Sequence, residues 1–263
     1  MRLSGATVLL TGASGGLGEA IARELHGRGA RLVLTGRRAE VLDALAQELD
    51  ARAVAADLAD RAQVERLVAE AGTVDVLVAN AALPGTGLLE RMATEEVDRV
   101  LEVNLRAPIA LAHALAPAMA ARGGGHLLFV SSLAGKAAAA RSALYNATKF
   151  GLRGFALALR RDLRPSNVGV SVVCPGFISE AGLFADSGAK LPPGVGTRSP
   201  HDVARAVAEA IEHNRGEVDV APLPLRVGTL LAGALPDLAA TITRLAGGDR
   251  LAASIADGQR DKR

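Results

Sequence analysis

Short apolar runs alternate along most of the chain with longer segments in which apolar residues recur at helical spacing. The alternation predicts an α/β fold: a doubly wound (Rossmann) parallel sheet of seven strands with helices on both faces. The predicted strands are Ala6–Leu10, Arg31–Thr35, Ala51–Ala55, Val74–Ala79, His126–Ser131, Val168–Val173 and Val218–Val220. The predicted helices are Gly16–Arg28, Ala39–Leu49, Arg61–Ala71, Glu95–Arg122, Tyr145–Leu163 and His201–His213.

Length and composition favour one domain. The 263 residues are 49% hydrophobic but only 2% aromatic, so Ala, Val and Leu must build the core. A single core can still serve a chain of this length. We expect a dinucleotide-binding and catalytic domain at 1–222 with a substrate lid at about 177–200. A helical tail at 223–263 is expected to cover the pocket, a partner subunit or a membrane surface.

Charge and cysteine content exclude several classes of protein. Thirty basic against 28 acidic residues give a net charge of +2, so nucleic acid is not an expected partner. The single cysteine and five scattered histidines predict neither a disulfide nor a metal site. No apolar stretch approaches the roughly 20 residues of a membrane helix. We expect a cytoplasmic protein.

A glycine-rich turn, Thr11 to Gly18, follows the first predicted strand and opens the first predicted helix. Gly12, Gly16 and Gly18 would let the backbone approach a pyrophosphate, whose charge the helix N-terminus favours. The alternative is an ordinary strand-to-helix turn. Further residues have to decide between the two.

The turn resembles the TGxxxGxG motif of the classical short-chain dehydrogenase/reductase family, and further motifs of that family follow in order between about Leu3 and Val220. The resemblance implies a nicotinamide dinucleotide as cofactor. The residues that it assigns to cofactor binding are Gly12, Ser14, Gly15, Gly16, Leu17, Gly18, Asp57, Leu58, Asn80, Ala81, Tyr145, Lys149, Pro175, Gly176 and Ile178. The chain departs from the family at Ala82, which replaces a glycine, and at Glu180, which replaces a common threonine; Ser179 is a possible substitute for that hydroxyl.

The catalytic residues implied by the resemblance are Ser132, Tyr145, Lys149 and Asn104. Tyr145 and Lys149 are four residues apart, so they share one face of a helix. An ammonium beside a phenol should lower the phenol's pKa from about 10. Ser132 lies at the family's interval before Tyr145 and is preferred to Ser131, while Asn104 is expected to distort its helix and to relay protons through water.

Cofactor preference is predicted from the end of the second strand. NAD-preferring relatives carry an acidic residue where this chain has Gly36, and Arg37 and Arg38 follow. Guanidinium groups pair well with a 2′-phosphate, so NADP(H) is favoured over NAD(H). The alternative is that both arginines are simply solvated at a helix start.

These residues together predict reduction of a hydrophobic ketone, aldehyde or 3-oxoacyl-type substrate with NADPH. Two alternatives stay open: an NAD-dependent dehydrogenase of the alcohol or hydroxysteroid type working oxidatively, and a non-catalytic NADP-binding sensor. The resemblance also implies a homodimer or homotetramer, with the helices at 95–122 and 145–163 packed across a two-fold axis.

Overall fold

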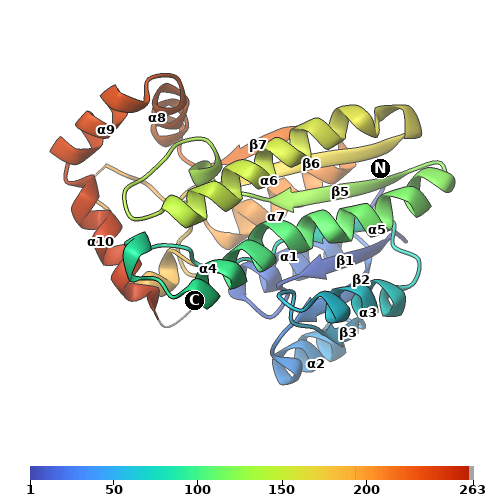
Figure 1. Cartoon of the computed structure of the whole chain (residues 1–263). Coiled ribbons are helices and arrows are strands. Elements are labelled where there is room, and N and C mark those ends of the chain that lie inside the picture. Colours follow the sequence, from blue (N-terminus) through green and yellow to red (C-terminus); the bar gives the residue numbers. More distant parts are fainter. Residues whose placement is uncertain (193, 261–263) are drawn as a thin grey trace.

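The computed structural model describes residues 1–192 and 194–260, and in this part of the chain seven parallel strands form one sheet in the order β3-β2-β1-β4-β5-β6-β7 (Figure 1). The predicted doubly wound Rossmann sheet is confirmed. The strands are β1 (Thr7–Thr11), β2 (Arg31–Gly36), β3 (Arg52–Ala55), β4 (Val76–Ala79), β5 (Gly125–Val130), β6 (Val168–Pro175) and β7 (Glu217–Val220).

Helices cover both faces of the sheet. One core cluster lies under α1 (Gly16–Gly27), α2 (Ala39–Glu48) and α7 (Pro200–Glu212). The other lies under α3 (Arg61–Ala71), α4 (Thr94–Leu101), α5 (Ala107–Ala121) and α6 (Ala143–Asp162). Both clusters consist mainly of Val, Leu and Ala, and Phe129 is the largest fully buried side chain. Small side chains thus allow the helices to pack closely on the sheet.

The predicted helix at 95–122 is interrupted. After α4 the backbone makes a π-helical turn, η2 (Glu102–Arg106), before it continues as α5. Asn104 lies in the middle of this turn, as expected for a helix-distorting residue. π-Bulges are frequent at functional sites, because they re-aim a side chain without ending the helix.

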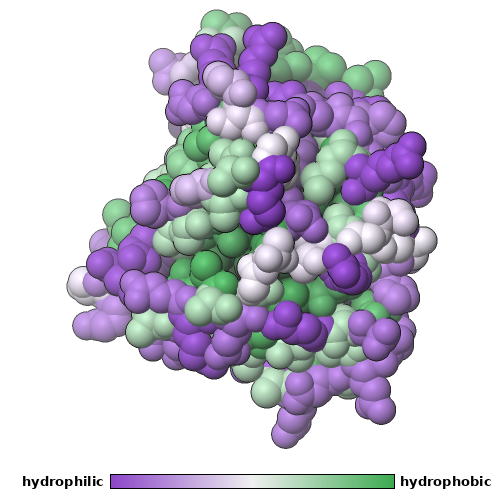
Figure 2. Space-filling view, turned by 90° about the vertical axis from the view of Figure 1, so that its right-hand side faces the viewer, coloured by the Kyte–Doolittle hydropathy of each residue, from purple (hydrophilic) through white to green (hydrophobic). Residues whose placement is uncertain are grey.

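Strand β4 begins at Val76, two residues later than predicted, and Asp75 just before it contacts β1 through both its backbone and its side chain. The Asp75 carboxylate accepts a hydrogen bond of 2.9 Å from the backbone amide of Thr7, at the start of β1. This contact fixes the beginnings of the two central strands. Seen from that end of the sheet, the surface carries many hydrophilic side chains around its edge (Figure 2).

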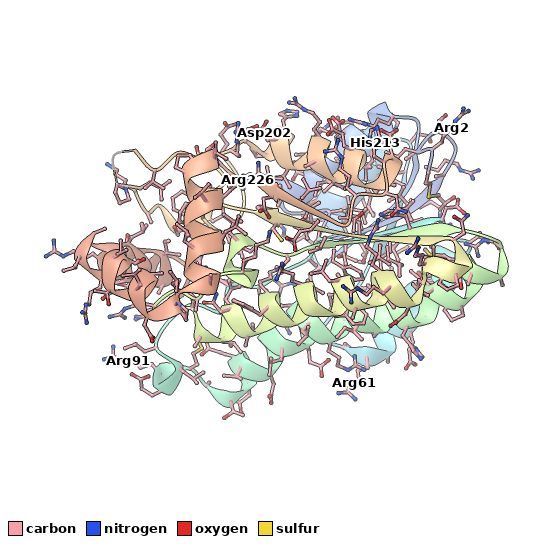
Figure 3. All side chains as sticks on the ribbon, turned by 90° about the horizontal axis from the view of Figure 1, so that it is seen from above. Arg2, Arg61, Arg91, Asp202, His213 and Arg226 are labelled. Atoms are coloured by element: carbon pink, nitrogen blue, oxygen red, sulfur yellow. The ribbon has the colours of Figure 1, made fainter. Side chains whose placement is uncertain are left out.

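The last described segment forms α8 (Leu223–Ala234), α9 (Pro236–Leu245) and α10 (Gly248–Gly258). These helices gather at the end of the molecule where the strands finish (Figure 1). Arg226 is part of α8, and Arg2 lies towards the opposite end (Figure 3). Within the described residues, no helix is long and apolar enough to cross a membrane.

Candidate active site

The sheet order reverses between β1 and β4, and the backbone there is tied together by one side chain. The Asn80 side-chain amide donates to the carbonyl of Thr11 at 3.0 Å. In return, the Thr11 hydroxyl accepts hydrogen bonds from the amides of Asn80 and Ala81 at 3.0 and 3.1 Å. Ligands of open α/β sheets bind at the carboxyl ends of strands at such a switch point. Asn80 thus fixes the floor of the candidate site.

The glycine turn leaves no room for side chains. A Cβ on Gly12, which has φ +68°, would lie 2.8 Å from the Cα of Ala81, and one on Gly18 would lie 2.1 Å from the carbonyl oxygen of Gly12. A Cβ on Gly16 would lie 2.7 Å from that of Ala181, in the segment after β6. The glycines therefore allow the turn itself, the loop after β4 at Ala81 and the segment after β6 at Ala181 to pack together at the start of α1.

The start of α1 lacks a protein cap. Its N-cap is Gly15, which has no side chain to accept from the first amides. By contrast, Asp60 and Ser199 cap α3 and α7 with side-chain oxygens. The uncapped amides and the helix dipole form a donor set suited to a pyrophosphate, so the residues present fit a dinucleotide. Leu17 packs on the core beneath this turn.

The end of β2 presents arginine to the same region. Arg37 is exposed, and the Arg38 guanidinium donates to the carbonyl of Ser14. A Cβ on Gly36 would lie 2.7 Å from the Ser14 hydroxyl oxygen, so a side chain at the position that is acidic in NAD-preferring relatives would require the Ser14 hydroxyl to rotate away.

Asp57 follows β3 and forms an ion pair of 2.8 Å with Arg99 on α4. Burial opposes ionisation of Asp57, but hydrogen bonds from the Ala59 amide and Arg99 outweigh it, so its pKa lies below the ordinary value. Asp57 does not cap α3, a role that Asp60 takes. The neighbouring Leu58 is buried in the core, which leaves its backbone for any cofactor contact.

Three of the four expected catalytic side chains, those of Ser132, Tyr145 and Lys149, lie close together. Ser132 follows β5, and its hydroxyl accepts from the amide of Ala134 at 3.1 Å and donates to the carbonyl of Pro175 at 3.3 Å. Tyr145 lies in the first turn of α6, and the Lys149 ammonium nitrogen is 5.6 Å from its ring centroid. Ser131, the weaker candidate, instead donates to the backbone carbonyl of Lys149 at 3.0 Å.

The expectation that Lys149 lowers the pKa of Tyr145 is wrong for this structure. Burial raises the pKa of Tyr145 to about 12, and the Ser132 hydroxyl opposes the rise only in part. Lys149 is itself 2% exposed and donates to the carbonyl of Val130 at 3.0 Å. Its own pKa is lowered by burial to about 8. Desolvation is thus the largest cause of both pKa shifts.

The Asn104 side chain hydrogen-bonds to the loop after β4 and to α6. Its amide donates to the carbonyl of Leu83 at 2.9 Å and to the Thr148 hydroxyl at 3.4 Å, and its oxygen accepts from the amide of Leu83 at 2.7 Å. This arrangement fixes the loop after β4 against α6. Asn104 positions this loop, and its side-chain oxygen keeps a second lone pair that can accept from a relay water.

The end of β6 closes the site from the other side. The amide of Gly176 donates to the carbonyl of Val220 at 3.0 Å, and a Cβ there would lie 3.1 Å from the Leu225 side chain on α8. Ile178 is buried and bridges to Arg198, which joins the two ends of the predicted lid. The Ser179 hydroxyl donates to the carbonyl of Arg198 at 3.3 Å, so it already has a partner within the protein.

Gln259 is a residue that the sequence did not single out. It is 3% exposed, accepts from the Thr86 hydroxyl at 2.7 Å and donates to the carbonyl of Leu183 at 2.6 Å. Thr86 lies in the loop after β4 and Leu183 in the predicted lid, so Gln259 joins both walls of the candidate site. No sequence signal links positions that are 173 residues apart.

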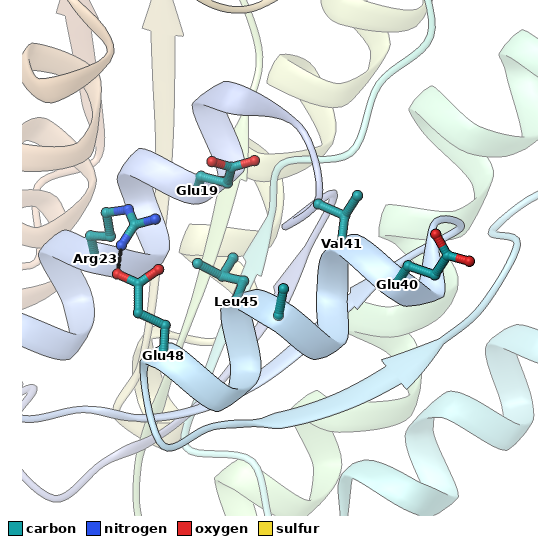
Figure 4. Close-up of a pocket in the computed structure, with 7 residues that line it drawn as sticks. Glu19, Arg23, Glu40, Val41, Leu45 and Glu48 are labelled. Atoms are coloured by element: carbon teal, nitrogen blue, oxygen red, sulfur yellow. Dashed lines mark hydrogen bonds and ion pairs between the residues drawn. The ribbon is translucent and has the colours of Figure 1, made fainter.

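Other surface features bear no catalytic residue. A hollow of about 360 Å³ between α1 and α2 is lined by Glu19, Arg23, Glu40, Val41, Ala44, Leu45 and Glu48 (Figure 4). Arg23 and Glu48 form an ion pair across it. In residues 1–192 and 194–260, no group of three or more His, Cys, Asp or Glu side chains is placed to hold a metal ion.

Comparison with known proteins identifies the family. The sequence profile of short chain dehydrogenases matches residues 6–191. The chain belongs to the short-chain dehydrogenase family. It is 36% identical to the ketoacyl reductase HetN of Nostoc sp., over 85% of this chain and 81% of that protein.

Two solved structures are similar in fold and size. The 3-ketoacyl-(acyl-carrier-protein) reductase of Brucella melitensis, complexed with NADH, has a TM-score of 0.75 and 30% identity, over 83% of this chain and 97% of the other. A short-chain dehydrogenase of Sphingobium yanoikuyae, complexed with NADPH, has a TM-score of 0.76 and 28% identity, over 89% and 94%. The protein is therefore an oxidoreductase of this family.

Proposed function

We propose that the protein reduces the carbonyl of a hydrophobic ketone, aldehyde or 3-oxoacyl-type substrate with NADPH. The observation that carries the proposal is the meeting of Ser132, Tyr145 and Lys149 at the carboxyl edge of the sheet, where the uncapped start of α1 also lies. A sensor that only binds a dinucleotide needs the glycine turn but not these three side chains. Their assembly supports an enzyme.

Each side chain has a role set by the charge that develops on the carbonyl oxygen. When bound, NADPH supplies the hydride. Tyr145 donates a proton to the oxygen, and Ser132 donates a hydrogen bond to it, so donors are in place before the negative charge appears. Asn104 and Asn80 position the strand ends and the α6 start that carry these groups.

The raised pKa of Tyr145 suits its role as a proton donor. A phenol whose pKa is about 12 is protonated at neutral pH, so Tyr145 begins as a donor. An oxidative reaction would need its phenolate as a base, which burial disfavours. Lys149, with a pKa of about 8, is the stronger acid and can return a proton to Tyr145. The proton therefore passes from stronger to weaker acid at each transfer.

NADPH is proposed as cofactor for two reasons. Gly36 places no negative charge where a 2′-phosphate would bind, and the exposed Arg37 can pair with that phosphate through its guanidinium. Arg37→Ala should raise the Michaelis constant for NADPH about tenfold, as expected for one exposed charge-assisted contact, and leave that for NADH within twofold. Arg52→Ala is the matched control, because Arg52 begins the neighbouring strand β3 and so lies at the other edge of the sheet. Equal changes for both cofactors would contradict the assignment.

The substrate class is proposed from the apolar walls and from the relatives. Phe177 and Phe184 of the predicted lid pack together with ring centroids 4.8 Å apart, and Leu83 is buried on the facing loop. HetN and the Brucella enzyme are both described as ketoacyl reductases. We further propose that the enzyme acts in the cytoplasm.

A substrate panel tests the function directly. Oxidation of NADPH is followed by absorbance with a 3-oxoacyl thioester, a long aliphatic ketone, an aldehyde and a sugar. We expect the first three to be reduced and the 3-oxoacyl thioester to give the highest kcat/KM. If the protein binds NADPH but oxidises it with none of these carbonyl compounds, the proposal is refuted.

A further inference from the structure

The helices α8 and α9 expose an apolar surface that the described chain does not cover. Eight large apolar side chains of the two helices and their junction are 46 to 80% exposed: Leu223, Val227, Leu230, Leu231, Leu235, Leu238, Ile242 and Leu245. Twelve large apolar side chains are exposed in the described residues as a whole, so most of them are concentrated here. We call these eight residues the α8–α9 face.

α9 lacks the packing that a short helix needs. None of its ten residues is buried. An isolated helix of this length is marginal in water, and helices in proteins owe most of their stability to a packed apolar side. Leu238, Ile242 and Leu245 recur at i, i+4 and i+7 and so form one stripe along the helix. The stripe is therefore suited to packing against a further surface.

The size of the face fits a protein interface. The eight side chains present apolar area on the order of 600 Å², at the upper limit of the largest patch on a typical monomer. A standard interface buries about 800 Å² on each partner, rim included. Two copies of this face would thus supply the area of one stable contact.

The charges around the stripe are self-complementary. Asp237 lies in the first turn of α9 and Arg244 in the last. If two copies of α9 pair antiparallel about a point between Thr241 and Ile242, Leu238 of one copy meets Leu245 of the other, and Asp237 lies about 3 Å along the helix axis from the level of the partner's Arg244. A two-fold contact requires such a pattern, in which one surface matches itself. An anionic bilayer instead favours a basic rim, which the mixed charges of this segment do not provide.

We propose that the α8–α9 face is a two-fold interface between two copies of this chain, with α9 packed antiparallel against its counterpart. The contact is separate from any pairing through α5 and α6. It would also fix α8, whose Leu225 side chain packs near Gly176 at the candidate site. Assembly through this face would therefore stabilise one wall of that site.

Light scattering coupled to size-exclusion chromatography tests the interface on the full chain. Ile242→Glu should halve the mass of the assembly, because a carboxylate would be buried at the two-fold axis. Ala240→Glu adds the same charge on the opposite side of α9 and should leave the mass unchanged. Far-UV circular dichroism checks that both variants remain folded.

Charge exchange tests the antiparallel pairing itself. Asp237→Arg and Arg244→Asp each place like charges opposite one another, so each protein alone should show half the wild-type mass. Mixed in equal amounts, the two variants should restore it, because each copy then offers opposite charges to the other. A wild-type chain that is monomeric overturns the proposal, as does an unchanged mass for Ile242→Glu. Binding of the wild-type monomer to phosphatidylserine vesicles would assign the face to a membrane and also overturn it.

Discussion

Ionisation of Tyr145 can be followed without a label, because the chain contains one tyrosine and no tryptophan. Near-ultraviolet absorbance of the phenolate therefore reports this side chain alone. Burial raises the pKa of Tyr145 to about 12 from an ordinary value of 10.0. Two units correspond to about 2.7 kcal/mol against ionisation. At pH 10 about one phenol in a hundred should be ionised, against half for a solvent-exposed tyrosine.

The perturbation is a step from pH 7 to pH 10 in the folded protein. Lys149 has a pKa of about 8, so it is mostly neutral at pH 10 and Lys149→Met should leave the phenolate signal unchanged. Protein unfolded in guanidinium at pH 10 gives the half-ionised reference, and far-UV circular dichroism shows whether the native samples stay folded. Half or more phenolate at pH 10 with native dichroism would refute the desolvation argument.

Two further predictions concern stability and the walls of the site. Burial lowers the pKa of His126 to about 3 from 6.5, so between these pH values the unfolded chain binds a proton that the folded chain does not. The free energy of unfolding should therefore fall by about 2 kcal/mol when the pH is lowered from above 6.5 to 5. Chemical denaturation of His126→Gln should lack this loss, whereas exposed His113→Gln should keep it; an unchanged pH dependence in His126→Gln would contradict the assignment. Gln259→Ala removes the hydrogen-bond partner of the Thr86 hydroxyl and of the Leu183 carbonyl, which costs about 1–3 kcal/mol. Proteolysis within residues 183–190 should therefore be at least about fivefold faster than in wild type. The control Arg260→Ala, at an exposed position, should be cleaved at the wild-type rate. Equal cleavage rates for Gln259→Ala and wild type would show that Gln259 does not hold the lid.

The glycine turn and the Tyr145 and Lys149 pair could be predicted because their chemistry is local. Helical spacing puts Lys149 beside Tyr145 whatever surrounds them, and the turn between β1 and α1 needs glycine for reasons within a few residues. The strand and helix order follows from hydrophobic periodicity in the same way. Ends of elements were less well predicted, as at β4, which begins at Val76 although the backbone of Asp75 still bonds to Thr7 and His126.

The direction of the Tyr145 pKa shift could not be predicted, because it depends on how deeply the assembled fold buries both groups. The hydrogen bonds from Asn104 to Leu83 could not be predicted either, because they depend on how the loop after β4 packs against η2. Gln259 and the α8–α9 face depend on contacts between distant segments, beyond the motifs shared with the family. These features follow from packing, which spacing along the chain does not determine.

Proton donation by Tyr145 is the central step of the proposed reaction, and removal of its hydroxyl oxygen tests that step most directly. Tyr145→Phe keeps the ring and its packing but removes the hydroxyl. With the best carbonyl substrate, kcat should fall at least about a hundredfold, the contribution expected of a positioned acid, while the dissociation constant for NADPH stays within about twofold. Turnover of Tyr145→Phe within tenfold of wild type, with NADPH binding intact, would contradict the central claim.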